Sequence, residues 1–109
     1  MVRINIARDF TRFPSGRFKR NGETSGEAFR EKFLQPTIIN GDVVEVELDG
    51  TVGYGSSFLE EAFGGLVRAL PIPPDEVKQR VKIISNDKTL IGEISQYLDD
   101  AARLKNSAR

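Results

Sequence analysis

Apolar and polar residues alternate in three short stretches of the chain. Residues 2–8, 43–48 and 80–84 each carry apolar side chains at every second position. Successive side chains of a strand point to opposite faces, so this period predicts strands with one buried face and one solvated face. Strands that are covered on both faces would instead be continuously apolar. The three stretches therefore predict one small sheet with helices packed mainly on one face.

Three other stretches repeat their apolar residues at the spacing of an amphipathic helix. They cover residues 26–34, 58–69 and about 88–104. We expect the first helix to end before Pro36, because a proline disfavours helical backbone in the residue that precedes it. Three prolines at 71, 73 and 74 end the second helix, and Pro74 can open a short helical turn before the third strand.

Turn-forming and capping residues join these elements. Pro14-Ser15-Gly16 lies between aromatic residues and predicts a short hairpin after the first strand. Thr24-Ser25-Gly26-Glu27 and Ser57-Phe58-Leu59-Glu60 fit capping boxes, in which the acid reaches back to the cap residue. Gly64 and Gly65 lie inside a helical pattern and indicate close approach to the sheet or to a partner's backbone. The order predicts a two-layer α/β fold with a small mixed sheet, in a single domain of residues 1–109.

The composition excludes several classes of function. The chain of 109 residues contains no Cys and no His, so it has no disulfide, no thiolate chemistry and no Ser-His-Asp triad. We expect no metal and no cofactor. The formal net charge is zero, which does not favour a nucleic-acid-binding protein. No apolar run approaches the length of a membrane span, and no signal-peptide pattern is present, so we expect a cytoplasmic protein.

The glycine-rich stretch of residues 50–65 holds most of the functional information. A predicted strand ends at Asp49, and Ser56 and Ser57 open a helix. In the simplest interpretation, the glycines form the turn and the serines cap the helix. A helix N-terminus also favours an anion or a phosphate attached to one of these serines. A P-loop is excluded, because the turn contains no Lys.

Two blocks of sequence resemble a known family. One is Arg12-Phe13-Pro14-Ser15-Gly16-Arg17, followed by Ser25-Gly26-Glu27-Ala28-Phe29-Arg30. The other is Tyr54-Gly55-Ser56-Ser57-Phe58-Leu59-Glu60-Glu61-Ala62-Phe63-Gly64-Gly65-Leu66. A strand followed by such a serine turn and a helix resembles the STAS domain of sulfate transporters and anti-sigma factor antagonists. The blocks are most similar to the STAS-like family of small bacterial and phage-borne proteins, over about residues 10–70.

The resemblance implies a non-enzymatic signalling module that acts through a protein partner. In anti-sigma factor antagonists, a histidine-kinase-like ATPase phosphorylates a serine at the start of the helix. Ser56 matches that position, and Ser57 is a second candidate. The antagonists usually carry Asp directly before this serine, whereas this chain has Gly55. We expect a partner such as this ATPase or a serine kinase to contact the turn.

Four residues around the serines are candidate partner contacts. We expect Tyr54 and Gly55 to present the turn to a partner. Glu61 is expected to be exposed, because Glu60 serves as the acid of the capping box. Phe58 lies at the edge of the apolar stripe and is either a core residue or an exposed anchor.

A different class of function starts from the first block. Arg12, Ser15, Gly16 and Arg17 could bind a phosphate through guanidinium groups and backbone amides. This chain would then be a sensor or an enzyme for a small phosphorylated ligand or a nucleotide, if the first block folds near the serine turn. A third alternative is a phage accessory protein that captures a host protein without phosphorylation.

Overall fold

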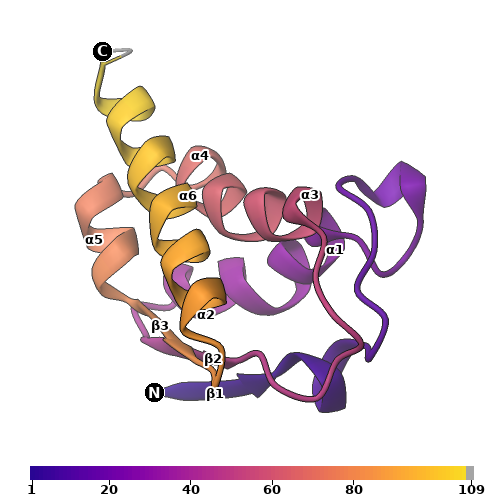
Figure 1. The fold of residues 1–109 in the computed structure, drawn as a ribbon. Helices are drawn as coiled ribbons and strands as arrows, with labels where there is room; N and C mark the ends of the chain where they lie inside the picture. The colour runs from indigo at the N-terminus through magenta and orange to yellow at the C-terminus, as the bar shows by residue number, and fades with distance from the viewer. Residues whose placement is uncertain (108–109) are drawn as a thin grey trace.

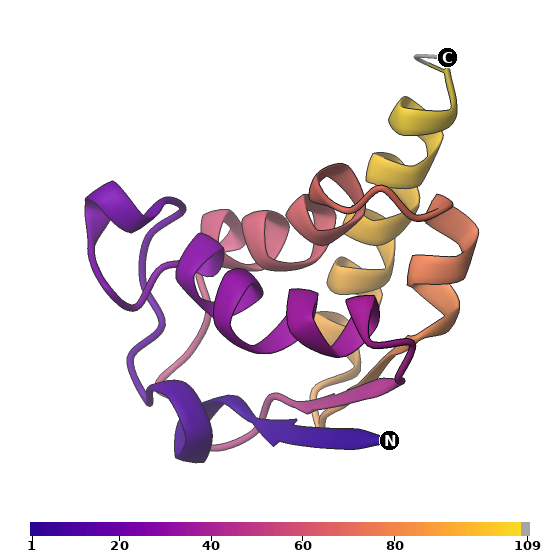
Figure 2. The ribbon, with the colours of Figure 1, turned by 180° about the vertical axis from the view of Figure 1, so that it is seen from behind.

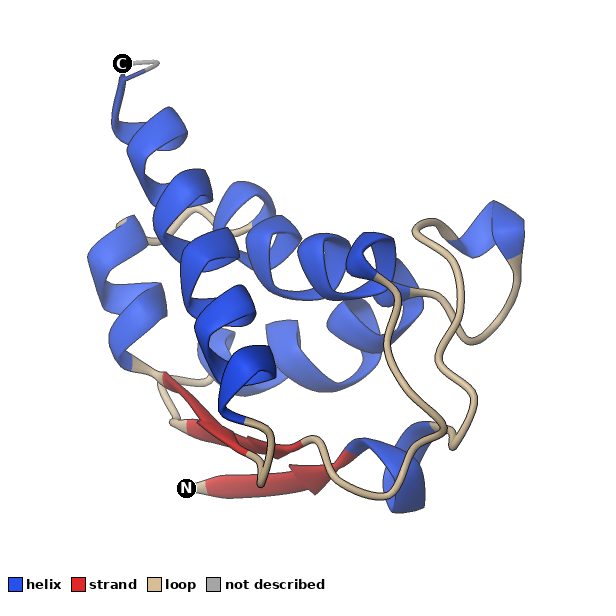
Figure 3. Cartoon of the chain, in the orientation of Figure 1, coloured by secondary structure: helices blue, strands red, loops and turns tan. Residues whose placement is uncertain are grey.

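A computed structural model describes residues 1–107 of the chain. Its sheet contains β1 (Val2–Asn5), β2 (Val44–Glu47) and β3 (Val81–Ile84), in that order. Both pairings are parallel, and Val44 of the central strand lies between Val2 and Val81. Figure 3 shows these strands as a single layer, with most of the helices above it.

Two helices form the middle of the helical layer, and each contains one π-helical turn. The first comprises α1 (Gly26–Phe29), η3 (Arg30–Leu34) and α2 (Gln35–Ile39). The second comprises α3 (Ser56–Leu59), η4 (Glu60–Gly64) and α4 (Gly65–Ala69). The remaining helical segments are η1 (Ile6–Phe10), η2 (Lys19–Asn21), α5 (Pro74–Gln79) and α6 (Lys88–Ser107). Helices α1 to α6 lie on one side of the sheet when it is seen from the front and from behind (Figures 1 and 2).

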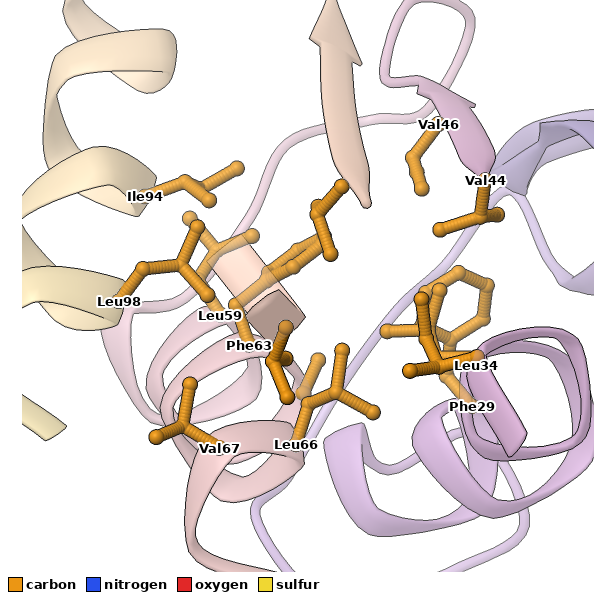
Figure 4. Packing of buried hydrophobic residues seen from close by; sticks show 14 of the residues in the cluster. Phe29, Leu34, Val44, Val46, Leu59, Phe63, Leu66, Val67, Ile94 and Leu98 are labelled. Atoms are coloured by element: carbon orange, nitrogen blue, oxygen red, sulfur yellow. The ribbon is translucent and has the colours of Figure 1, made fainter. Parts of the chain in front are cut away.

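The hydrophobic core lies between the sheet and this helical layer. Val44 and Val46 of β2 are fully buried, whereas Glu45 and Glu47 lie on the opposite face. The strand pattern therefore matches the one-sided packing that the alternation predicted. Figure 4 shows the inward valines facing side chains of the helices, among them Phe29 and Phe63.

The predicted two-layer α/β class is confirmed, with three local differences. The sheet is parallel rather than mixed. The first strand ends at Asn5, because the side chain of Asn5 accepts a hydrogen bond from the Arg8 N–H and caps the turn η1. The predicted hairpin near residues 12–18 is wrong. In its place is a loop, held to the start of α1 by hydrogen bonds such as Gly26 N–H to the Gly16 carbonyl at 3.0 Å.

The prediction that the first helix ends before Pro36 is also wrong. The Gln35 N–H donates to the carbonyl of Arg30, five residues back, which makes a π-helical turn. Pro36 then occupies the first turn of α2, where its missing N–H is tolerated. The helix therefore continues to Ile39. No helix within residues 1–107 has the length and apolar character that crossing a membrane requires.

Candidate functional site

The glycine-rich turn that joins β2 to α3 is fixed at its first residue by Asp49. The Asp49 carboxylate accepts hydrogen bonds from the Ser85 hydroxyl at 3.0 Å and the Asn86 N–H at 3.2 Å. These bonds join the end of β2 to the loop that follows β3. Gly50 and Gly53 have φ angles of 106° and 140°, which residues with a side chain rarely adopt. Glycine is therefore required at these two positions for the backbone conformation of the turn.

Tyr54 fixes the second half of the turn. Its hydroxyl donates to the Leu48 carbonyl at 2.6 Å, and its ring centroid lies 6.0 Å from that of Phe58. Burial raises the pKa of the Tyr54 phenol. Phe58 is 1% exposed, so of the two alternatives the core position is the one found. Phe58 therefore cannot contact a partner in this conformation, and the expected exposure of Tyr54 is only partial.

Ser56 and Ser57 are the first two residues of the helix, after Gly55 at the cap position. All three residues are exposed. Within residues 1–107 neither serine hydroxyl has a hydrogen-bond partner, so the predicted capping box of Ser57 and Glu60 is wrong. The first turn is closed instead by the backbone, through Leu59 N–H and the Gly55 carbonyl at 3.2 Å. Both hydroxyls are therefore accessible and uncommitted.

Glu61 is buried, which contradicts its predicted exposure. It is 7% exposed, and its carboxylate lies 2.9 Å from the guanidinium of Arg30, itself 6% exposed. Arg30 also donates to the Glu61 carbonyl and to the Gln35 side chain. A buried charge requires such a set of partners, because desolvation of an unpaired ion is costly. Glu61 therefore joins two helices and is not available to a partner.

Glu60 also forms ion pairs with arginines instead of capping the helix. Its carboxylate lies 2.6 Å from the guanidinium groups of Arg17 and Arg68. Hydrogen bonds from Arg68 and then Arg17 hold the pKa of Glu60 below its ordinary value, against the opposing effect of burial. The two π-helical turns, η3 and η4, are thus joined by ion pairs. We call the acidic and basic side chains that form these pairs the paired-acid cluster. It consists of Arg17, Arg30, Glu60, Glu61 and Arg68.

The predicted close approach at the glycine pair involves side chains of this cluster. A Cβ atom on Gly65 would lie 2.8 Å from Arg30 Nε and 2.9 Å from a Glu61 carboxylate oxygen. Gly65 therefore makes room for the buried ion pair, and the atoms it approaches within residues 1–107 belong to side chains rather than to the sheet.

The loop of residues 12–17 lies next to the serine turn. The Val52 N–H donates to the Arg12 carbonyl at 2.9 Å, and Arg17 reaches Glu60 as described above. Arg17 is thus already bound to a carboxylate. Ser15 is held through its N–H by the Thr24 carbonyl, and Gly16 has a φ of 91°. Of the four candidate anion-binding residues, Arg12 alone presents a charge that is exposed and has no ion pair within residues 1–107.

Two apolar residues near the turn were missed by the sequence interpretation. Phe13 is 63% exposed and Val52 is 68% exposed, and they lie on the two loops that the Val52–Arg12 hydrogen bond joins. Apolar side chains inside a Pro- or Gly-rich loop were the available signal.

A cavity of about 410 Å³ opens where β2 and β3 end. Its lining includes the acidic residues Asp49 and Asp87 and the apolar residue Leu90, and it contains neither Lys nor Arg. Ligands of open α/β sheets often bind at this edge, but two carboxylates disfavour a phosphate. Within the described residues no group of three potential metal ligands is found.

Comparisons with known proteins identify one family. A family model described as "STAS-like domain of unknown function (DUF4325)" matches residues 25–90. The match includes the two helices with π-helical turns, β2, β3 and the serine turn, whereas the block of residues 12–17 lies outside it. Neither the curated proteins nor the solved structures yielded a match. Because the match covers more than half of the 109 residues, this chain belongs to the family of STAS-like domains of unknown function.

Proposed function

We propose that this chain is a non-enzymatic signalling module, bound by a protein partner at the turn of residues 53–57. One observation carries the proposal: Ser56 and Ser57 are exposed and have no hydrogen-bond partner within residues 1–107, on a turn whose other residues are fixed. The serines do not serve as the side-chain cap of the helix. They are therefore free for a regulatory role.

Phosphorylation at Ser56 would change the charge of this surface. A phosphoserine carries about −1.5 to −2 charges and is stabilised at a helix N-terminus by the helix dipole and free N–H groups. Glu60 lies four residues further along, on the same face of the helix. The phosphate would compete with Glu60 for Arg17, which now lies 2.6 Å from that carboxylate. Phosphorylation could thereby alter the loop of residues 12–17 as well as the turn.

The partner that fits this chemistry is a histidine-kinase-like ATPase or a serine kinase. The STAS-like family of the chain supports this choice, since STAS domains of anti-sigma factor antagonists meet such kinases at the corresponding turn. Phe13 and Val52 would supply apolar contacts beside the serines.

Affinity capture from the native cells, with mass spectrometry of the bound proteins, tests the proposal. We expect an ATPase or a kinase among them. With the partner in hand, Ser56→Ala should bind like the wild type and lose the response to ATP, whereas Ser56→Asp should bind more weakly. Ser107→Asp is a matched control, because Ser107 is exposed at the far end of α6. If a verified partner binds Ser56→Ala, Ser56→Asp and the wild type alike, in the presence and absence of ATP, the switch is refuted.

The alternative function, binding of a small phosphorylated ligand, has its own test. We expect no thermal stabilisation of the protein by a panel of nucleotides and inorganic phosphate. Stabilisation that is lost in Arg12→Ala would instead support a ligand site at the loop of residues 12–17.

A further inference from the structure

The strand β3 lies at one edge of the sheet. The N–H groups of Val44, at the start of β2, and of Leu48, directly after β2, donate to the carbonyls of Arg80 and Ile84. In a parallel ladder the bonding residues alternate with residues that point away, so the N–H and C=O groups of Val81 and Ile83 face outward. These groups have no partner within residues 1–107; Ile83 is partly exposed, whereas Val81 is 7% exposed, so pairing starts at Ile83. An edge of this kind can accept a further strand.

An apolar groove runs beside this edge, between β3 and α6. It has a volume of about 300 Å³ and is lined by Val81, Ile83, Ile91 and Leu98. Lys78 and Asp99 form an ion pair of 2.8 Å among the polar residues that line it. Figure 1 shows β3 between its neighbours α5 and α6. The groove is also lined by Lys82 and Ser95, so a strand added to the edge would place every second side chain against four apolar and four polar residues.

Charges on the open face of the sheet indicate what that strand should carry. Arg3, Glu45 and Lys82 lie in one row across the three strands, so the charge alternates from positive to negative to positive. Arg3 is near Glu45, at 3.9 Å, whereas the exposed Lys82 has no ion pair within the described part of the chain. Opposite charges on directly paired strands are favourable and like charges are not. The next residue of the row should therefore be acidic.

We propose that the β3 edge binds an extended segment of a partner protein, with the pattern apolar, acidic, apolar. The apolar residues would enter the groove beside Ile83, and the acid would lie opposite Lys82. A second copy of the chain fits less well. Its β1 would bring Arg3 opposite Lys82, and its β3 would bring a second Lys82 to the same face. This site shares no residue with the turn of residues 53–57, and it does not depend on phosphorylation.

A synthetic peptide of residues 42–49, Asp-Val-Val-Glu-Val-Glu-Leu-Asp, serves as the probe because it has the required pattern. NMR spectra of the full chain, with amide exchange, would be recorded with and without the peptide. We expect shifts and slower exchange at the amides of Val81 and Ile83. A control peptide with Lys at both Glu positions should bind roughly two- to tenfold more weakly, and Lys82→Glu should reverse this preference.

Backbone pairing and self-association are tested alongside. A peptide N-methylated at the residues that would face β3 should not bind, because it lacks the N–H groups of a strand. The proposal is overturned if the original peptide causes no change at Val81 and Ile83 at millimolar concentration. It is also overturned if Lys82→Glu leaves the preference unchanged, or if sedimentation shows a dimer in which these amides are already protected.

Discussion

Two consecutive turns of the same helix have opposite environments. Ser56 and Ser57 in the first turn are exposed and have no hydrogen-bond partner for their hydroxyls within residues 1–107. Glu60 and Glu61, one turn later, form ion pairs with three arginines. Arg17 lies in the loop of residues 12–17, Arg30 in η3 and Arg68 in α4. The first two turns of this helix therefore have separate roles. The two acids hold helices together, whereas the two serine hydroxyls make no bond that the fold uses within residues 1–107.

The difference shows why the acids are poor candidates for recognition and the serines are good ones. A carboxylate that is buried against an arginine can leave only at the cost of an unpaired buried charge. An exposed hydroxyl can be modified without the loss of any bond that the fold uses. Substitutions in the two turns test whether their environments differ in this way.

The largest effect is expected at Glu61. Glu61→Ala leaves the buried guanidinium of Arg30 with only the more distant carboxylate of Glu27, at 4.0 Å, and should destabilise the protein by about 3–5 kcal/mol. Urea unfolding followed by circular dichroism measures this. Ser57→Ala is the matched control from the first turn, and it should change the stability by no more than about 0.5 kcal/mol.

Replacing both members of the buried pair sharpens the result. Arg30→Met combined with Glu61→Leu removes both charges at once, so its stability should lie much closer to the wild type than that of Glu61→Ala. A Glu61→Ala protein that is as stable as Ser57→Ala would show that the two turns do not differ as we describe.

A medium effect is expected at Gly26, where α1 touches the first turn of α3. A Cβ atom there would clash with the Phe58 carbonyl oxygen and would lie 3.1 Å from the Ala62 nitrogen. Because both are backbone atoms, the helices must separate, and Gly26→Ala should cost about 1–3 kcal/mol in thermal unfolding.

Gly92→Ala is the control for this prediction. Gly92 lies in α6, is exposed and has no atom within 4 Å of an added Cβ. Alanine there should stabilise the protein by about 0.5–1 kcal/mol, since glycine is unfavourable inside a helix. If Gly26→Ala and Gly92→Ala change the stability in the same direction, the contact between α1 and α3 is not as close as the structure indicates.

Much of this architecture could be predicted from the sequence. Period-two alternation placed β2 and β3, and helical spacing placed residues 58–69 in a helix. The predicted end at Pro36 failed because a π-helical turn, closed by the Gln35 N–H and the Arg30 carbonyl, leaves Pro36 in the first turn of α2, where a proline is tolerated. The hairpin near residues 12–18 failed because the turn signal does not say which backbone groups will pair with it.

The position of the candidate serine turn could be predicted from the sequence, but the contacts of the residues around it could not. The serine turn could be found from the glycines and the start of the helix. Whether Glu61 is exposed depends on Arg30, which lies 31 residues earlier and meets it only in the folded chain. Two adjacent acids on a helix look alike in sequence, and only tertiary packing distinguishes the buried one.

The smallest effect concerns Glu60 and the acid stability of the second turn. Hydrogen bonds from Arg68 and Arg17 keep the pKa of Glu60 below its ordinary value of 4.5 in the folded protein. The stabilisation is therefore present above that value and is lost as the pH falls through the lowered pKa. Glu60→Gln cannot titrate, so its stability should fall less than that of the wild type between about pH 6 and about pH 3. Urea unfolding across this range measures the difference. Ser57→Ala should follow the wild-type curve, because the first turn contains no carboxylate. Equal slopes for Glu60→Gln and the wild type would mean that the arginines around the second turn do not hold Glu60 in its charged form.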